Sequence, residues 1–224
     1  MRTKATERPG ARWEFWVILK VILIVLTMMR ENKLGKEIET EERLREVLER
    51  YVAPAMLGLW GTKDYKTGQS LYGEIAGGDC VLKLGPDGLR RMTKAVFVDV
   101  MYCNGGQEYI LKEDRQEFSD GRARRRNLPG SAGEKVVTGE SFKQAVKRLI
   151  KDEELKGIGL STEGSRLIKK KKWRASGEAN SYPGLVTKSE NVKYEWKLRS
   201  DQGKPKDFSV REEDTITYFV WVRE

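Results

Sequence analysis

The chain contains no histidine among its 224 residues. This absence excludes histidine general bases, Ser-His and Cys-His nucleophile pairs, and metal sites built on histidine. Any catalysis would therefore use carboxylates, lysine, tyrosine, cysteine, or a metal ion held by oxygen ligands. Cysteine is also scarce, with Cys80 and Cys103 alone, which is too few for a disulfide framework or a zinc site. We therefore expect an intracellular protein in a reducing compartment, not a secreted one.

Acidic residues are fewer than basic ones. The chain has 34 Asp and Glu residues and 43 Lys and Arg residues, which gives a net charge of +9. A basic balance favours polyanionic partners such as nucleotides, RNA or acidic lipid headgroups. The plain alternative is a soluble basic surface without such a partner. The length suits one domain of ordinary size plus an appendage.

Long apolar runs are rare, and the clearest one lies near the N-terminus. Trp13 to Met29 is strongly apolar but is interrupted by Glu14 and Lys20. It is short for a membrane span, which needs about 20 apolar residues, and no cleavage site typical of a signal peptide stands out. We assign residues 1–35 to an apolar helix that anchors the chain to a membrane, targets it, or docks on protein. An organellar or membrane-associated location therefore stays open.

Residues 36–57 are predicted to form an amphipathic helix. Leu44, Val47, Leu48 and Tyr51 recur at helical spacing, and Pro54 is expected to stop the helix. Such a helix covers one face of a core or contacts a protein partner.

Residues 58–224 are predicted to form one domain that is rich in strands. The β-branched and aromatic run Thr93–Tyr102 reads as a central strand. The turn at 104–106 brings Glu108–Lys112 back as its hairpin partner. The other expected strands are Leu71–Ile75, Cys80–Leu84, Lys193–Arg199 and Thr215–Arg223.

Two polar segments interrupt this pattern of strands. Gln116–Asn127 is predicted to be a loop that holds several arginines, and Lys169–Lys172 to be a solvated loop or strand edge. Because strands outnumber helices and the hairpins are local, we expect the α+β class, with a mixed sheet and helices packed on it.

The segment after residue 140 predicts a well-defined helix. Ser141 and Gln144 have the spacing of a capping box. Phe142, Ala145, Val146, Leu149 and Ile150 then give the helix one apolar face.

Around this helix the chain resembles the Nudix hydrolase superfamily. Glu140 and Arg148 have the spacing of the Nudix box, and Ile150 takes the place of its aliphatic residue. Asp152 and Glu153 stand where the family has a pair of glutamates, and Leu128-Pro129-Gly130 resembles the tripeptide that opens the box. The resemblance covers residues 88–160, continues more weakly to the C-terminus, and leaves residues 1–57 outside.

The resemblance implies a Nudix-like mixed sheet and a metal-dependent diphosphate hydrolase. Glu140, Asp152 and Glu153 would hold Mg²⁺ through oxygen, which would neutralise a diphosphate and help to activate water. Asp152, Glu153 and Arg148 would be the catalytic residues, with Arg148 bracing the acidic cluster. The arginines that precede the box, Arg124, Arg125 and Arg126, would bind phosphate.

The box is degenerate, however, and the largest departure is Leu149. It replaces the glutamate that follows the arginine in the family pattern and extends the apolar face of the helix. The opening glycine would be displaced to Ser131 or Gly133, and the closing pair to Gly157-Ile158.

Three hypotheses follow. The first is a divergent Mg²⁺-dependent hydrolase of nucleoside diphosphate derivatives. The second, which the missing glutamate and the basic charge favour, is a non-catalytic Nudix-like subunit that contacts a nucleotide, RNA or protein. The third is a structural protein that Trp13 to Met29 tethers to a membrane.

Overall fold

The structure is a computed structural model. It describes Trp16, Lys20 and residues 38–62, 65–86, 88–104, 106–152, 155–158, 165–198, 206–212 and 214–224. The predicted apolar helix at 1–35 thus lies outside the described residues, apart from Trp16 and Lys20. Within the described ranges, we find no helix with the length and hydropathy that crossing a bilayer requires.

The described residues build one mixed sheet with a few helices. The sheet order is β6-β7-β2-β3-β9-β8, and β1, β4 and β5 pair at its side. The strands β2 and β7 are parallel, whereas the other pairs are antiparallel. The α+β class with a mixed sheet is therefore confirmed at this level.

The elements follow in chain order. The helices are α2 (Glu41–Tyr51), α3 (Pro54–Leu57), α4 (Gly68–Ala76), α5 (Phe142–Lys151) and the 3-10 helix η1 (Lys156–Ile158). The strands are β1 (Cys80–Gly85), β2 (Gly88–Asn104), β3 (Gln107–Phe118), β4 (Ala123–Arg124), β5 (Ala132–Lys135), β6 (Arg166–Ala179), β7 (Tyr182–Leu198), β8 (Phe208–Glu212) and β9 (Thr215–Arg223).

The long strand β2 is the centre of the sheet and contains the predicted central strand. Every second side chain, at Val96, Val98 and Val100, is fully buried, as the pleat of a strand requires. At its far end β2 forms the predicted hairpin with β3, in which Asn104 pairs with Gln107.

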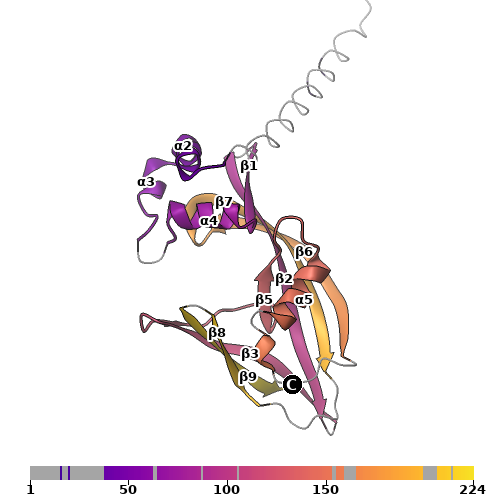
Figure 1. The fold of residues 1–224 in the computed structure, drawn as a ribbon. Coiled ribbons are helices and arrows are strands. Elements are labelled where there is room, and N and C mark those ends of the chain that lie inside the picture. Colours follow the sequence, from indigo (N-terminus) through magenta and orange to yellow (C-terminus); the bar gives the residue numbers. More distant parts are fainter. Residues whose placement is uncertain are drawn as a thin grey trace, which may run out of the picture.

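The apolar residues form two clusters. The helices that cover them, α2 and α4 for one and α5 for the other, lie over different stretches of the sheet (Figure 1). At one end, α2, α4 and β1 enclose residues such as Leu44, Leu71 and Leu185. Further along, α5 covers Val96, Val192 and their neighbours on the sheet. The two long strands therefore connect both clusters.

Helix α5 begins with the predicted capping box. The Ser141 hydroxyl accepts a hydrogen bond from the Gln144 backbone N–H, and the Gln144 side chain accepts one from the Ser141 backbone N–H. These bonds satisfy N–H groups that have no partner within the helix. The helix buries Ala145, Val146 and Leu149 against the sheet, so its predicted apolar face is confirmed.

Two predictions near the N-terminal cluster are wrong. Leu71–Ile75 lies in helix α4 and not in a strand, because the Thr67 side chain caps the helix at the Ser70 N–H. The helix predicted over 36–57 is not continuous, because α2 ends at Tyr51, ahead of Pro54. Pro54 is the first residue of α3, where its missing N–H costs no hydrogen bond.

The predicted loop at Gln116–Asn127 is also partly wrong, because β3 continues to Phe118 and β4 follows. The reason is tertiary, since the buried Gln116 donates to Thr217 Oγ1 of β9 at 2.9 Å. Lys169–Lys172 lies in the edge strand β6, in agreement with the strand-edge alternative. The late strand predicted from Lys193 begins earlier, at Tyr182.

The Leu-Pro-Gly segment docks directly on the backbone of β2. The Ser131 N–H donates to the Val98 carbonyl at 2.7 Å, and the Ser131 hydroxyl accepts from the Val100 N–H at 2.9 Å. A Cβ atom on Gly130 would lie 2.9 Å from the Val98 carbonyl oxygen. Glycine is therefore required here by close approach to a strand.

We predict that Gly130→Ala lowers the free energy of unfolding by about 1–3 kcal/mol, because the added methyl group displaces rigid backbone. Urea unfolding followed by circular dichroism measures this loss. The control is Gly177→Ala in β6, where an added Cβ meets no atom within 4 Å. Equal stability of the two variants would contradict the packing role of Gly130.

Candidate functional site

Glu140 and Arg148 form an ion pair, in which Glu140 precedes α5 and Arg148 lies in the last turn of that helix. Arg148 Nη2 lies 3.0 Å from Glu140 Oε2, and Arg148 Nε donates to Oε1 at 3.2 Å. The Val137 N–H also donates to Oε2, at 3.1 Å. The Arg148 hydrogen bonds lower the pKa of Glu140, against a smaller opposing effect of burial. Both oxygens of this carboxylate are therefore engaged by the protein itself.

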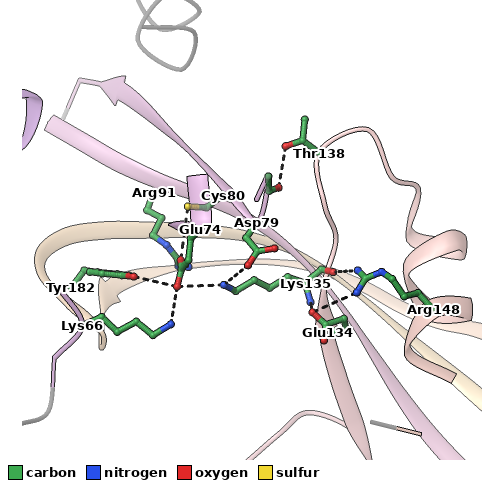
Figure 2. Close-up of polar contacts among 11 residues, drawn as sticks. Lys66, Glu74, Asp79, Cys80, Arg91, Glu134, Lys135, Thr138, Arg148 and Tyr182 are labelled. Atoms are coloured by element: carbon green, nitrogen blue, oxygen red, sulfur yellow. Dashed lines mark hydrogen bonds and ion pairs between the residues drawn. The ribbon is translucent and has the colours of Figure 1, made fainter. Parts of the chain in front are cut away.

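Arg148 also fastens helix α5 to strand β5. Its Nη2 donates to the Lys135 carbonyl at 2.8 Å, and its Nη1 lies 3.9 Å from Glu134 Oε1 (Figure 2). The arginine thus pairs with the acidic side chains around it and holds the loop between β5 and α5 in place.

The predicted Mg²⁺ ligands are not brought together among the described residues. Asp152 is the exposed C-cap of α5, whereas Glu140 precedes the helix. The ten residues of α5 separate them by a rise of about 15 Å. Glu153 lies outside the described residues. In the described part of the chain, no group of three Cys, Asp or Glu side chains is placed to share a metal ion, so this part does not fit the cofactor.

Leu149 is fully buried in the cluster between α5 and the sheet. A carboxylate at this position would enter the core and not the surface on which Glu140 lies. The departure from the family pattern therefore contributes to packing.

The three predicted phosphate-binding arginines contact partners within the protein. Arg124 Nε donates to Gln116 Oε1 at 2.9 Å. Arg125 lies 3.3 Å from Asp114. Arg126 Nε donates to both oxygens of Glu113, at 2.8 and 2.9 Å, and the Glu113 side chain is only 3% exposed. Arg126 thus neutralises a buried carboxylate, whereas Arg124 and Arg125 are exposed.

Arg124 and Arg126 line an open cleft of about 1020 Å³, and Arg125 is not part of its lining. The cleft lies between β2 and β5 on one side and β3, β4, β8 and β9 on the other. Its charged lining residues are Arg124, Arg126, Lys135, Lys156 and Arg211, with Asp79, Glu134, Glu212 and Asp214. Lys156 and Arg211 form no ion pair with any described residue.

Sequence reasoning missed a buried ionic network centred on Glu74 of α4 (Figure 2). Glu74 is 8% exposed. Its carboxylate accepts hydrogen bonds from Lys66 at 2.8 Å, from Tyr182 at 3.2 Å and from Arg91. Lys135 completes the network at 3.4 Å from Glu74. One signal was available, because Glu74 lies one helical turn after Leu71 on the apolar face of a short helix.

The network changes the ionisation of its members. Burial alone would raise the pKa of Glu74, but hydrogen bonds from Lys66 and Arg91 and the nearby positive charges lower this pKa to about 2. Burial raises the pKa of the neighbouring Cys80 thiol to about 11, which disfavours the nucleophilic thiolate. The network is therefore a neutralised structural centre and not a nucleophilic site.

Comparison with known proteins gives no family assignment. No protein-family profile matches the chain, and no curated protein matches it. Among solved structures, the chain is similar to an Ap4A hydrolase from C. elegans, with 15% identity and a TM-score of 0.29, over 58% of this chain and 79% of that one. Similarity at this level does not establish a shared activity.

We predict that Glu74→Gln lowers the free energy of unfolding at pH 7 by about 3 kcal/mol, because the surrounding cations lose their counter-charge. The pKa of Glu74 is depressed from 4.5 to about 2 in the folded state. Its contribution is therefore complete above pH 4.5 and disappears as the pH falls through 2.

Urea unfolding at pH values from 7 to 2 measures this effect as the difference between wild type and variant. The difference should shrink below pH 4.5. Glu108→Gln, at an exposed position, is the control and should show little difference at any pH. A difference for Glu74→Gln that stays constant down to pH 2 would contradict the assignment.

We predict that Leu149→Glu, which restores the residue of the family pattern, lowers the free energy of unfolding by more than about 3 kcal/mol. The control Leu149→Met keeps the volume and should cost less than about 1.5 kcal/mol. Thermal unfolding compares the two variants. A Leu149→Glu variant as stable as wild type would show that position 149 reaches solvent.

Proposed function

We propose that this chain is a Nudix-like domain that binds a phosphate-bearing nucleotide and does not hydrolyse it efficiently. The observation that carries the proposal is how the side chains on and next to helix α5 are buried and paired. Position 149 lies in the core, and Glu140 is engaged by Arg148 and by the Val137 N–H. The residues that survive from the box pattern therefore serve the fold, whereas the carboxylate chemistry is incomplete among the described residues.

The cleft supports the binding part of the proposal. Arginine suits phosphate because its planar guanidinium can donate two parallel hydrogen bonds. Arg124 is held beside the Phe118 ring, with its Cζ atom 5.0 Å from the ring centroid. This contact and the bond to Gln116 orient the guanidinium before a ligand arrives, which lowers the entropic cost of binding. Lys156 and Arg211 add exposed positive charge to the same cleft.

Isothermal titration calorimetry of the full chain with ADP tests binding. We expect Arg124→Ala to weaken ADP binding by about tenfold, the effect of losing a charge-assisted hydrogen bond of roughly 1.5 kcal/mol. Lys143→Ala, an exposed cation on α5 outside the cleft, is the matched control and should bind ADP like wild type. Equal affinities for wild type and Arg124→Ala would contradict binding in this cleft.

A hydrolysis screen over nucleoside diphosphate derivatives with Mg²⁺ tests the catalytic part. We expect no turnover above background, and no change on Asp152→Asn or Glu153→Gln. Turnover that depends on Mg²⁺ and is lost on Glu153→Gln would overturn the proposal in favour of a divergent hydrolase.

A further inference from the structure

A second hollow with a basic lining lies beside the cleft and plays no part in the proposed function. It is a groove of about 740 Å³, bounded by strands β1, β2, β6 and β7 and by the loop 136–139. Of the residues that the structure describes, Asp79 alone lines both hollows. The groove is therefore adjacent to the cleft but is built from different side chains.

The four cations of the groove come from four different strands. Lys83 lies on β1, Lys94 on β2, Arg174 on β6 and Lys188 on β7. The strand register sets them side by side, since Lys94 and Arg174 both pair with Glu190 of β7. The charges therefore spread along the groove and do not converge on one point.

This positive charge is only partly balanced within the groove. None of the four cations forms a side-chain hydrogen bond or ion pair with the described residues. The two acidic residues of the groove are already paired, Asp79 with Lys135 at 3.0 Å and Glu190 with Lys172 at 2.5 Å. Lys94 and Arg174 lie close enough to Glu190 for their charges to lower its pKa. The lining nevertheless holds four cations against two carboxylates, and this excess in a concave surface creates a local positive potential that attracts anions.

The shape of the groove selects among anionic partners. Lys83 and Lys188 are half-buried, so a flat anionic membrane cannot reach them, whereas a thin flexible chain can. The volume is in the range of pockets for small ligands, about 300–1,000 Å³, which admits a few nucleotides of a single strand but not a duplex. The hydroxyl group of Ser176, which pairs with Lys188 in the strand register, adds a neutral donor to the lining.

We propose that this groove binds the phosphodiester backbone of single-stranded RNA. Among the described residues that line it, none is aromatic, so base stacking does not contribute and the phosphates carry the recognition. Binding should accordingly depend strongly on salt and little on sequence.

Fluorescence anisotropy of the full chain with a labelled 12-nucleotide oligouridine tests the proposal over a range of salt concentrations. The variant Lys94→Ala/Arg174→Ala removes two exposed cations of the groove. We expect it to bind at least about tenfold more weakly, with the slope of log affinity against log salt reduced by about 1.4, since each phosphate contact on a single strand contributes about 0.7.

The matched control, Lys169→Ala/Lys171→Ala, removes two exposed cations of β6 that do not line the groove. It should keep the affinity and the salt slope of wild type. Equal losses for both double variants would overturn the proposal, because they would mean diffuse attraction by net charge. Unchanged binding of Lys94→Ala/Arg174→Ala would overturn it as well.

Two further measurements separate the groove from other sites and ligands. Saturating ADP should leave oligouridine bound, because the cleft and the groove are distinct, so failure of ADP binding leaves this proposal standing. A duplex RNA of equal length should bind more weakly than the single strand. Tighter binding to the duplex, or to vesicles of anionic lipid, would overturn the assignment to single-stranded RNA.

Discussion

The neutralisation of one buried carboxylate, that of Glu74, determines how the helical end of the molecule joins the sheet. A buried charge is costly unless oppositely charged and hydrogen-bonding groups surround it. Arg91 of β2 and Lys135 of β5 meet this need, so α4 can sit in one place only relative to both strands. Lys135 also links this network to α5, because its carbonyl accepts a hydrogen bond from Arg148. A chain of contacts thus runs from α4 to α5 across the sheet (Figure 2).

The segment from Gly130 to Arg148 shows how several short-range contacts hold a loop and a helix against the sheet. Gly130 permits close contact with Val98, the Ser131 hydroxyl accepts a hydrogen bond from the buried Val100 N–H of β2, and Ser141 starts α5. Arg148 holds the loop before the helix. Each of these tasks would remain necessary for folding whether or not a metal ion ever bound.

The sequence predicts the elements whose cause is local. The capping box and the apolar face of α5, the central strand and its hairpin are all contained in short windows of residues. The α+β class and the mixed sheet follow from the order of these elements. At the candidate site, the pairing of Glu140 with Arg148 is within reach of sequence reasoning, because Glu140 directly precedes one predicted helix and Arg148 lies in that helix.

The elements that sequence reasoning missed depend on distant partners. The strand β3 extends through a polar segment because the Gln116 side chain donates a hydrogen bond to Thr217, about a hundred residues later in the chain. The segment Leu71–Ile75 is short and ambiguous in pattern, and its helical state depends on the cap at Thr67 and on burial of Glu74. No local pattern shows that Arg126 neutralises Glu113 or that cations from four strands line one groove.

The parallel pair β2 and β7 has a consequence for how the molecule comes apart. Leu89 and Leu185 of these strands lie in the cluster with α2 and α4, whereas Val96 and Val192 lie in the cluster with α5. The backbone hydrogen bonds between β2 and β7 run without interruption from one cluster to the other. Opening of either cluster therefore breaks hydrogen bonds between strands that also support the other cluster. The two clusters therefore constitute a single cooperative unit.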